Sequence, residues 1–203
     1  MFDARIRPII DPPLNQMGRT LASTGLSPDT VTLVGFVLGM GAAVSIAFGE
    51  ILLGLVLILL NRLADGLDGA IARASLKTDR GGYLDIVLDF VFYGSIPFAF
   101  AVLNPEQNAL PATALLLSFY ANGSAFLAYA IMAEKRQVTT TSQGVKSLYY
   151  VAGIAEGTET IALFVVMCLW PAGFPVLAWG FAAICLISAA ARIVGASLSL
   201  SRK

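Results

Sequence analysis

Residues 65–89 read DGLDGAIARASLKTDRGGYLDIVLD and decide the fold. They carry two pairs of aspartates, Asp65 with Asp68 and Asp85 with Asp89, spaced three and four residues apart. Residues at these spacings lie on one face of an α-helix. The two predicted helices are joined by a turn of roughly five residues, which favours antiparallel neighbours. The stretch therefore predicts a helical pair whose four aspartates face one another.

The composition of the chain predicts that this helical pair lies in a membrane. Of 203 residues, 57% are hydrophobic and 13% are charged, and the mean hydropathy is +0.79. Soluble domains carry about 25% charged residues. Apolar stretches of about 20 residues recur along the chain, and each is long enough to cross a bilayer core. We expect an all-α, polytopic membrane protein. Its expected surroundings are the lipid bilayer, and it is not expected to bind nucleic acid.

Six membrane spans are expected in a single domain covering residues 1–203, preceded by an amphipathic helix at the membrane interface. This interfacial helix falls within residues 1–25, and the prolines up to Pro13 predict that its regular part follows them. Residues 26–30, Leu-Ser-Pro-Asp-Thr, are expected to supply a turn and the N-cap of the first span. The spans are expected at residues 30–48, 51–75, 81–103, 109–133, 145–169 and 174–198.

The distribution of Lys and Arg predicts the orientation. These residues precede the first span, lie between spans two and three and between spans four and five, and follow the sixth span. The other three connections contain none. The positive-inside rule assigns the basic side to the cytoplasm. The first residues also lack the apolar core of a signal peptide. We expect an integral protein of a bacterial inner membrane, with both termini and the active site on the cytoplasmic side.

Carboxylates at membrane depth require compensation, because each ionised one costs roughly 2.5–3.5 kcal/mol even on a lenient scale. At 1.5 Å per residue, both aspartate pairs reach a depth of about 6–13 Å from the cytoplasmic end and can converge. Converging carboxylates repel one another unless cations lie between them. The chain contains no His, so oxygen must bind any metal, which favours Mg²⁺ or Mn²⁺. Two such ions would neutralise the cluster and bridge a phosphate.

Other interpretations of the acidic cluster remain open at this point. It is also typical of a proton or divalent-cation pathway in a transporter. A second possibility is that the aspartates only form salt bridges with Arg62, Arg73 and Arg192. A non-catalytic membrane scaffold is a third alternative, although such a protein would most naturally have lost one of the aspartates.

Small residues along the chain have two interpretations each. Glycines around the aspartates either pack helices or make room for a nucleotide: Gly66, Gly69, Gly81 and Gly82. Gly35 and Gly39 form a G-x-x-x-G pattern, which favours packing against neighbouring helices or dimerisation. Cys168 and Cys185 lie in apolar runs and are expected to be core residues rather than a disulfide or metal site.

The pattern D-x-x-D-G-x-x-A-R, followed by G-x-x-x-D-x-x-x-D, resembles the signature of the CDP-alcohol phosphatidyltransferase family. Every fixed position is present between Asp65 and Asp89. The gap between Arg73 and Gly81 is one residue shorter than is common, but it lies in the predicted cytoplasmic turn and leaves both helical registers intact. The six-span layout and the interfacial helix extend the likeness over the whole chain.

The resemblance implies an enzyme of phospholipid biosynthesis that transfers a phosphatidyl group from CDP-diacylglycerol to a small polar alcohol and releases CMP. It also implies two divalent metal ions, Mg²⁺ or Mn²⁺, and a homodimer. The implied metal site consists of Asp65, Asp68, Asp85 and Asp89, with Asp89 also the general base. The implied CDP-binding residues are Pro28, Thr32, Asp65, Gly69, Ala72, Arg73, Lys77 and Gly81. Lys77 is equally well explained as a positive-inside residue.

The acceptor alcohol is expected to contact residues toward the last spans: Arg136, Lys146, Glu156 and Glu159. The family's inositol-phosphate enzymes are similar here but carry arginines between and after the glutamates. This chain reads Glu156-Gly157-Thr158-Glu159-Thr160 instead, which disfavours inositol phosphate. Arg136 and Lys146 would still bind one phosphate, so glycerol 3-phosphate is the first expectation. Alternatively, the two glutamates only pair with Arg192 or Lys146.

Overall fold

The computed structural model describes residues 3–75, 77–136 and 157–201, and these residues contain no β-strand. They form seven α-helices and one short 3₁₀ turn, which confirms the expected all-α fold. The elements are α1 (Asp3–Ser23), α2 (Pro28–Ala47), α3 (Ile51–Ala74), α4 (Asp79–Leu103), α5 (Pro105–Lys135), α7 (Gly157–Leu169), η1 (Pro171–Gly173) and α8 (Phe174–Ser201).

The helices agree with the predicted spans to within a few residues at most ends. Among the described residues, four stretches are long and apolar enough to cross a membrane: α2, α4, α5 and η1 with α8. Helix α3 is also long enough, at 24 residues, but it is not one of these four because it carries Arg62, Asp65 and Asp68 within its apolar run. Helix α7 covers the second part of the expected span 145–169, and its first part lies outside the described residues.

Helix α1 begins earlier than the sequence predicts, because it continues through Pro8, Pro12 and Pro13. Each proline removes one backbone donor, but its fixed φ near −65° is a helical value, so the chain remains helical here. The helix ends at Ser23, and Gly25 forms the turn to α2 with a φ of +82°, which favours glycine. The N-cap predicted within residues 26–30 is Ser27, whose side chain accepts a hydrogen bond from the Thr30 amide.

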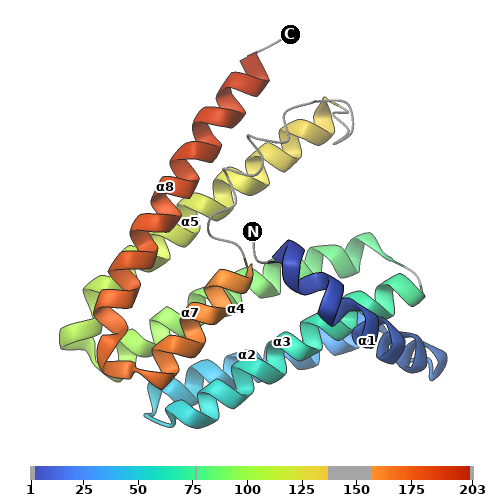
Figure 1. Cartoon of the computed structure of the whole chain (residues 1–203), viewed down its shortest axis with the longest axis horizontal. Coiled ribbons are helices and arrows are strands. Elements are labelled where there is room, and N and C mark those ends of the chain that lie inside the picture. Colours follow the sequence, from blue (N-terminus) through green and yellow to red (C-terminus); the bar gives the residue numbers. More distant parts are fainter. Residues whose placement is uncertain (1–2, 76, 137–156, 202–203) are drawn as a thin grey trace.

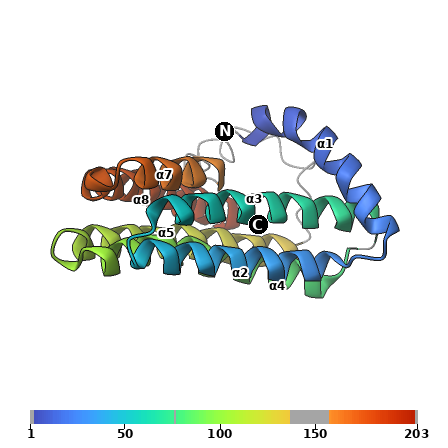
Figure 2. The ribbon, with the colours of Figure 1, turned by 90° about the horizontal axis from the view of Figure 1, so that it is seen from below.

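Helices α2, α3 and α4 form one packed unit, with α1 lying across α3 (Figures 1 and 2). Helices α5 and α8 form a second pair, which runs at an angle away from the first group in Figure 1. Aromatic side chains join the two groups. Phe100 of α4 stacks on Phe174 of α8, with ring centroids 4.7 Å apart, and Phe92 packs against Phe164 of α7. These contacts fix α4, one of the two aspartate helices, at the centre of the chain.

The G-x-x-x-G pattern of α2 packs against neighbouring helices of the same chain. A Cβ atom added at Gly35 would lie 2.9 Å from the Ala64 Cβ, and one added at Gly39 would lie 2.6 Å from the Phe92 ring. Both glycines are buried inside the protomer, so they serve helix packing. Cys168 and Cys185 are buried free thiols, as expected.

We expect Gly39→Ala to destabilise the protein, because the new methyl group would lie 2.6 Å from the Phe92 ring. Overpacking of this kind typically costs about 1–3 kcal/mol. The measurement is the midpoint of thermal unfolding in detergent. The matched control is Gly180→Ala on α8, where an added Cβ meets nothing within 4 Å. Equal midpoints for the two variants would contradict the close approach of α2 to α4.

Candidate functional site

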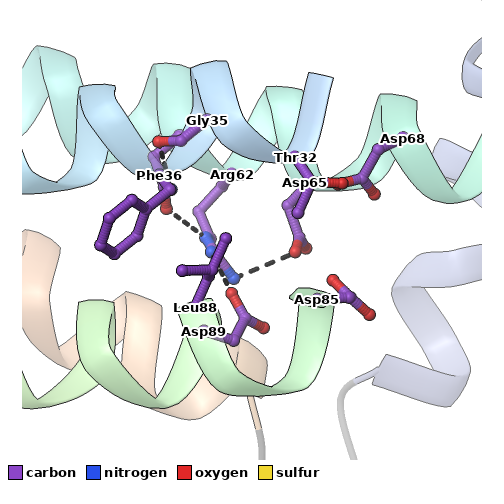
Figure 3. A pocket seen from close by; sticks show the side chains of 10 residues that line it. Thr32, Gly35, Phe36, Arg62, Asp65, Asp68, Asp85, Leu88 and Asp89 are labelled. Atoms are coloured by element: carbon purple, nitrogen blue, oxygen red, sulfur yellow. Dashed lines mark hydrogen bonds and ion pairs between the residues drawn. The ribbon is translucent and has the colours of Figure 1, made fainter. Parts of the chain in front are cut away.

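The two aspartate pairs converge between α3 and α4, as predicted, and α2 closes one side of the site (Figure 3). Asp65, Asp68 and Asp85 each offer a carboxylate oxygen, and these three oxygens all lie within 4.8 Å of one another. They open onto a pocket with lining residues Thr32, Gly35, Phe36, Asn61, Arg62, Asp65, Asp68, Asp85, Leu88 and Asp89. The site is therefore formed by three helices near the α3–α4 turn.

Asp68 is the most deeply placed of the ligand candidates, with 6% of its surface exposed. Thr32 of α2 donates a hydrogen bond from Oγ1 to Asp68 Oδ2 at 2.6 Å. A bond of this kind, from a neutral donor to a carboxylate, stabilises the ionised form and fixes its orientation. Thr32, which the sequence assigns to the CDP pocket, thus also holds a candidate metal ligand.

Asp89 lies in the same pocket but turns toward Arg62. The Arg62 guanidinium donates from NH2 to Asp89 Oδ1 at 2.7 Å, and its NH1 lies 3.5 Å from Asp65 Oδ2. The salt-bridge interpretation is therefore correct for Arg62. Arg73 instead donates two hydrogen bonds to Asn15 Oδ1 of α1, at 3.1 and 2.9 Å, and Arg192 lies over the ring of Phe126.

The donor set fits divalent metal ions. Arg62 balances only one of the four carboxylate charges that line the pocket. Three convergent carboxylates with oxygen donors on rigid helices match the preference of Mg²⁺ and Mn²⁺, and the chain has no His to favour a softer metal. The expectation of a divalent-metal cofactor is in agreement with this geometry.

The remaining CDP-pocket candidates lie beside the carboxylate pocket, toward the α3–α4 turn, and do not line it. Gly69 has open space, since an added Cβ would meet only the Arg73 NH1, at 3.3 Å. Gly81 is closer to its neighbours, because an added Cβ would lie 3.0 Å from Asp29 Oδ1. The other members are Pro28 and Ala72, which are half-buried, and Arg73 and Lys77, which are exposed.

Gly66 and Gly18 serve the packing of α1 on α3. A Cβ at Gly66 would lie 2.9 Å from Leu14 of α1, and one at Gly18 would lie 2.6 Å from the Ala70 Cβ. Helix α1 therefore lies directly on the helix that carries the first aspartate pair. Of the two interpretations given to Gly66, helix packing is the one that the structure supports.

The acceptor candidates are only partly brought together. Arg136 donates from NH2 to the Leu200 carbonyl oxygen at the end of α8, and it does not line the carboxylate pocket. Glu159 lies in the first turn of α7. That turn is close to the pocket, because a Cβ added at Gly157 would lie 3.3 Å from the hydroxyl of Tyr93, a partner of Arg62. Lys146 and Glu156 lie outside the described residues.

The fold and the site define a helical membrane protein with an acidic, metal-binding pocket between three helices. The family model for CDP-alcohol phosphatidyltransferase matches residues 26–194, and the chain belongs to this family. It is therefore a phosphotransferase of phospholipid synthesis, and the resemblance noted in the sequence is confirmed. Family membership also favours an enzyme over the transporter and scaffold alternatives.

One known protein resembles this chain over nearly its whole length, and another resembles about half of it. Inner membrane protein YnjF of Escherichia coli (strain K12) is 49% identical over 200 residues, which cover 98% of this chain and 97% of the relative. The archaetidylinositol phosphate synthase of Pyrococcus horikoshii is 35% identical over 100 residues, or 49% of this chain and 53% of the relative.

Solved structures of a Mycobacterium tuberculosis enzyme share the fold. The phosphatidylinositol phosphate synthase PgsA1 with CDP-DAG bound aligns with a TM-score of 0.69 and 21% identity, covering 90% of this chain and 92% of that one. The same protein in complex with manganese and citrate aligns with a TM-score of 0.65 and 19% identity, covering 91% and 88%.

Sequence reasoning did not assign a functional role to Arg62, Tyr93 or Asn15. For Arg62 a signal was present, because it precedes Asp65 by three residues and so shares its helical face. Tyr93 follows Asp89 by four residues and shares that face in the same way. Asn15 carried no such signal, since its partner Arg73 is distant in the sequence.

Proposed function

We propose that this protein is an inner-membrane enzyme that transfers the phosphatidyl group of CDP-diacylglycerol to a small polar alcohol and releases CMP. The observation that carries the proposal is the set of three carboxylate oxygens within 4.8 Å of one another, from residues that match the family motif. The name of the E. coli relative supports the inner membrane, and the CDP-DAG bound to PgsA1 supports the donor. The Lys and Arg distribution supports a cytoplasmic active site and cytoplasmic termini.

Asp65, Asp68 and Asp85 are the proposed metal ligands. The family resemblance assigns Asp89 to the metal site as well, but its oxygens lie outside the group of three, so it is proposed beside them as the general base. Bound divalent ions supply charge neutralisation at the diphosphate and at the departing CMP. Asp89 accepts the proton of the acceptor hydroxyl as its oxygen forms a bond to the phosphorus attached to diacylglycerol. The bond between that phosphorus and the bridging oxygen of CMP breaks, and the electron pair leaves with CMP. The pocket contributes mainly by positioning these groups.

The nucleotide is proposed to lie over the α3–α4 turn, next to the carboxylates. Arg73 would pair with the diphosphate, and the open surface at Gly69 would admit the nucleotide close to the helix backbone. Pro28, Ala72, Lys77 and Gly81 line the same end of the helices and complete the proposed pocket. A homodimer remains part of this proposal on the strength of the family resemblance.

Asn15→Ala is expected to weaken the donor complex without slowing chemistry, because Asn15 holds Arg73 through two hydrogen bonds. A typical intramolecular hydrogen bond is worth about 0.5–1.5 kcal/mol, so the KM for CDP-diacylglycerol should rise by roughly 2- to 10-fold with kcat unchanged. Steady-state kinetics of CMP release measure both constants. The control is Gln16→Ala, an exposed neighbour on α1. A fall in kcat with constant KM would contradict the proposed role of Arg73.

Glycerol 3-phosphate is the proposed acceptor. The support is the pair of cations Arg136 and Lys146, together with the absence of arginines around Glu156 and Glu159 in the sequence. These two cations would bind the single phosphate of this acceptor. The glutamates would accept hydrogen bonds from its hydroxyl groups.

The test follows CMP release by the purified protein from CDP-diacylglycerol with Mg²⁺ or Mn²⁺. Each reaction contains one acceptor: glycerol 3-phosphate, glycerol, inositol, inositol phosphate, serine, choline or phosphatidylglycerol. Release that requires glycerol 3-phosphate and stops with EDTA would support the whole proposal. Release with a different alcohol would keep the reaction and replace the acceptor. No release with any acceptor, and no binding of CDP-diacylglycerol or Mn²⁺, would refute the proposed reaction.

A further inference from the structure

Arg62 places a positive charge deep in the carboxylate pocket (Figure 3). Its side chain is 16% exposed, and its guanidinium carbon lies 4.7 Å from the ring centroid of Phe92 and 5.4 Å from that of Tyr93. A charged residue within a membrane helix is costly unless it is paired and usually has a function. The contacts of Arg62 indicate which function this is.

Two neutral partners fix the orientation of the guanidinium. Nε donates to Asn61 Oδ1 at 2.8 Å, and NH1 donates to the Tyr93 hydroxyl at 3.1 Å. Asn61 is itself buried and donates from Nδ2 to the Gly35 carbonyl oxygen at 2.8 Å, so the anchor extends to α2. Together with the two aromatic rings, these bonds hold Arg62 independently of the aspartates.

The nitrogen that remains, NH2, makes the shortest charged contact in the pocket, with Asp89 Oδ1 at 2.7 Å. The contact with Asp65 is longer, at 3.5 Å. The three gathered ligand oxygens come from the other aspartates and do not include Asp89. Arg62 is thus an anchored donor whose strongest bond goes to the one aspartate outside the ligand group.

We propose that Arg62 is a positioning residue for the reaction: it holds Oδ1 of Asp89 and leaves Oδ2 to accept the proton of the alcohol. The inference rests on the proposed role of Asp89 as the general base. A carboxylate held at one oxygen samples fewer orientations, and this reduces the cost of reaching the reactive geometry. Arg62 itself touches neither substrate nor reacting atoms in this arrangement.

The kinetic test compares Arg62→Met with the unchanged protein, using the acceptor that gives the fastest CMP release. We expect kcat to fall by about 10- to 100-fold, with the KM for CDP-diacylglycerol within about twofold. Arg62→Lys should recover part of the rate, because lysine keeps the charge but loses the fixed fork of donors. In an Asp89→Asn background, Arg62→Met should change kcat by less than about twofold, since the positioned group is already absent.

The control for loss of an arginine is Arg19→Met. Arg19 is exposed on α1 and is not among the residues that line the carboxylate pocket. Its kcat should stay within about twofold of the unchanged protein. An unchanged kcat in Arg62→Met, or a loss that persists fully in the Asp89→Asn background, would overturn the proposal.

Mn²⁺ binding, measured by calorimetry without substrate, gives a readout besides activity. Arg62→Met should bind Mn²⁺ at least as tightly as the unchanged protein, because a positive charge beside the ions is removed. A loss of about tenfold or more in affinity would show that Arg62 assembles the metal site instead, and would overturn the positioning role.

The two proposals fail in different ways. If Asp89→Asn keeps the full rate, the assignment of Asp89 as base fails. If no acceptor yields CMP, thermal unfolding in EDTA still tests the ion pair between Arg62 and Asp89. Arg62→Met and Asp89→Asn should each lower the unfolding midpoint. The double variant should unfold at no lower temperature than the less stable of the two single variants. Additive shifts would overturn the inference.

Discussion

Asp68→Asn is expected to abolish Mn²⁺ binding and CMP release together. Asp68 is 6% exposed and accepts a 2.6 Å hydrogen bond from Thr32, so the amide keeps the shape of the site but removes one ligand charge. The loss of one preorganised electrostatic group typically costs about 100- to 1,000-fold in kcat, and loss of the metal should place this variant at or beyond the upper end. Calorimetric Mn²⁺ titration and the CMP assay measure the two effects.

The matched control is Asp79→Asn, because Asp79 is an exposed aspartate in the first turn of α4 and does not line the pocket. It should bind Mn²⁺ and release CMP like the unchanged protein. If Asp68→Asn binds Mn²⁺ with full affinity, Asp68 is not a metal ligand, and the proposed metal site is wrong.

Asp89→Asn is expected to separate chemistry from metal binding. Loss of a positioned general base typically costs about 100- to 10,000-fold in kcat. The KM for CDP-diacylglycerol and the affinity for Mn²⁺ should change little, because the gathered ligand oxygens come from Asp65, Asp68 and Asp85. Kinetics at saturating Mn²⁺ and calorimetry on the same preparation test this. A parallel loss of Mn²⁺ affinity would show that Asp89 is also a metal ligand, as the family resemblance implies, and would contradict its assignment as a base alone.

Much of the site could be predicted from spacing alone. The aspartate pairs at three- and four-residue separation, joined by a short turn, predict two neighbouring helices with facing carboxylates, and the carboxylates of α3 and α4 do gather. The two helices make little direct contact, because α2 packs against both of them. The same spacing does not specify which donors the carboxylates meet. The bond from Thr32 to Asp68 joins residues 36 positions apart, and only the packing of α2 on α3 brings them together.

The errors have identifiable physical causes. The prolines of α1 predict a helix that begins after Pro13, yet the helix begins at Asp3. The prediction considers the hydrogen bond that each proline removes, but the fixed φ of proline is itself a helical value. Gly66 lies between the first two aspartates and was equally compatible with a nucleotide or a helix as its neighbour. The contact with Leu14 decides in favour of α1. Contacts between helices depend on side-chain shape at both surfaces, which periodicity does not encode.

The close contact between Gly18 and Ala70 has a practical consequence. An interfacial amphipathic helix, as the sequence predicts for α1, takes its tilt from the water–lipid boundary on which it rests. Because α1 lies almost backbone to backbone on α3, a micelle with the wrong curvature at that boundary would strain the helix that carries Asp65 and Asp68. We therefore expect rates measured in detergent to depend on how well the micelle reproduces a flat bilayer surface, and nanodiscs are the appropriate reference for this enzyme.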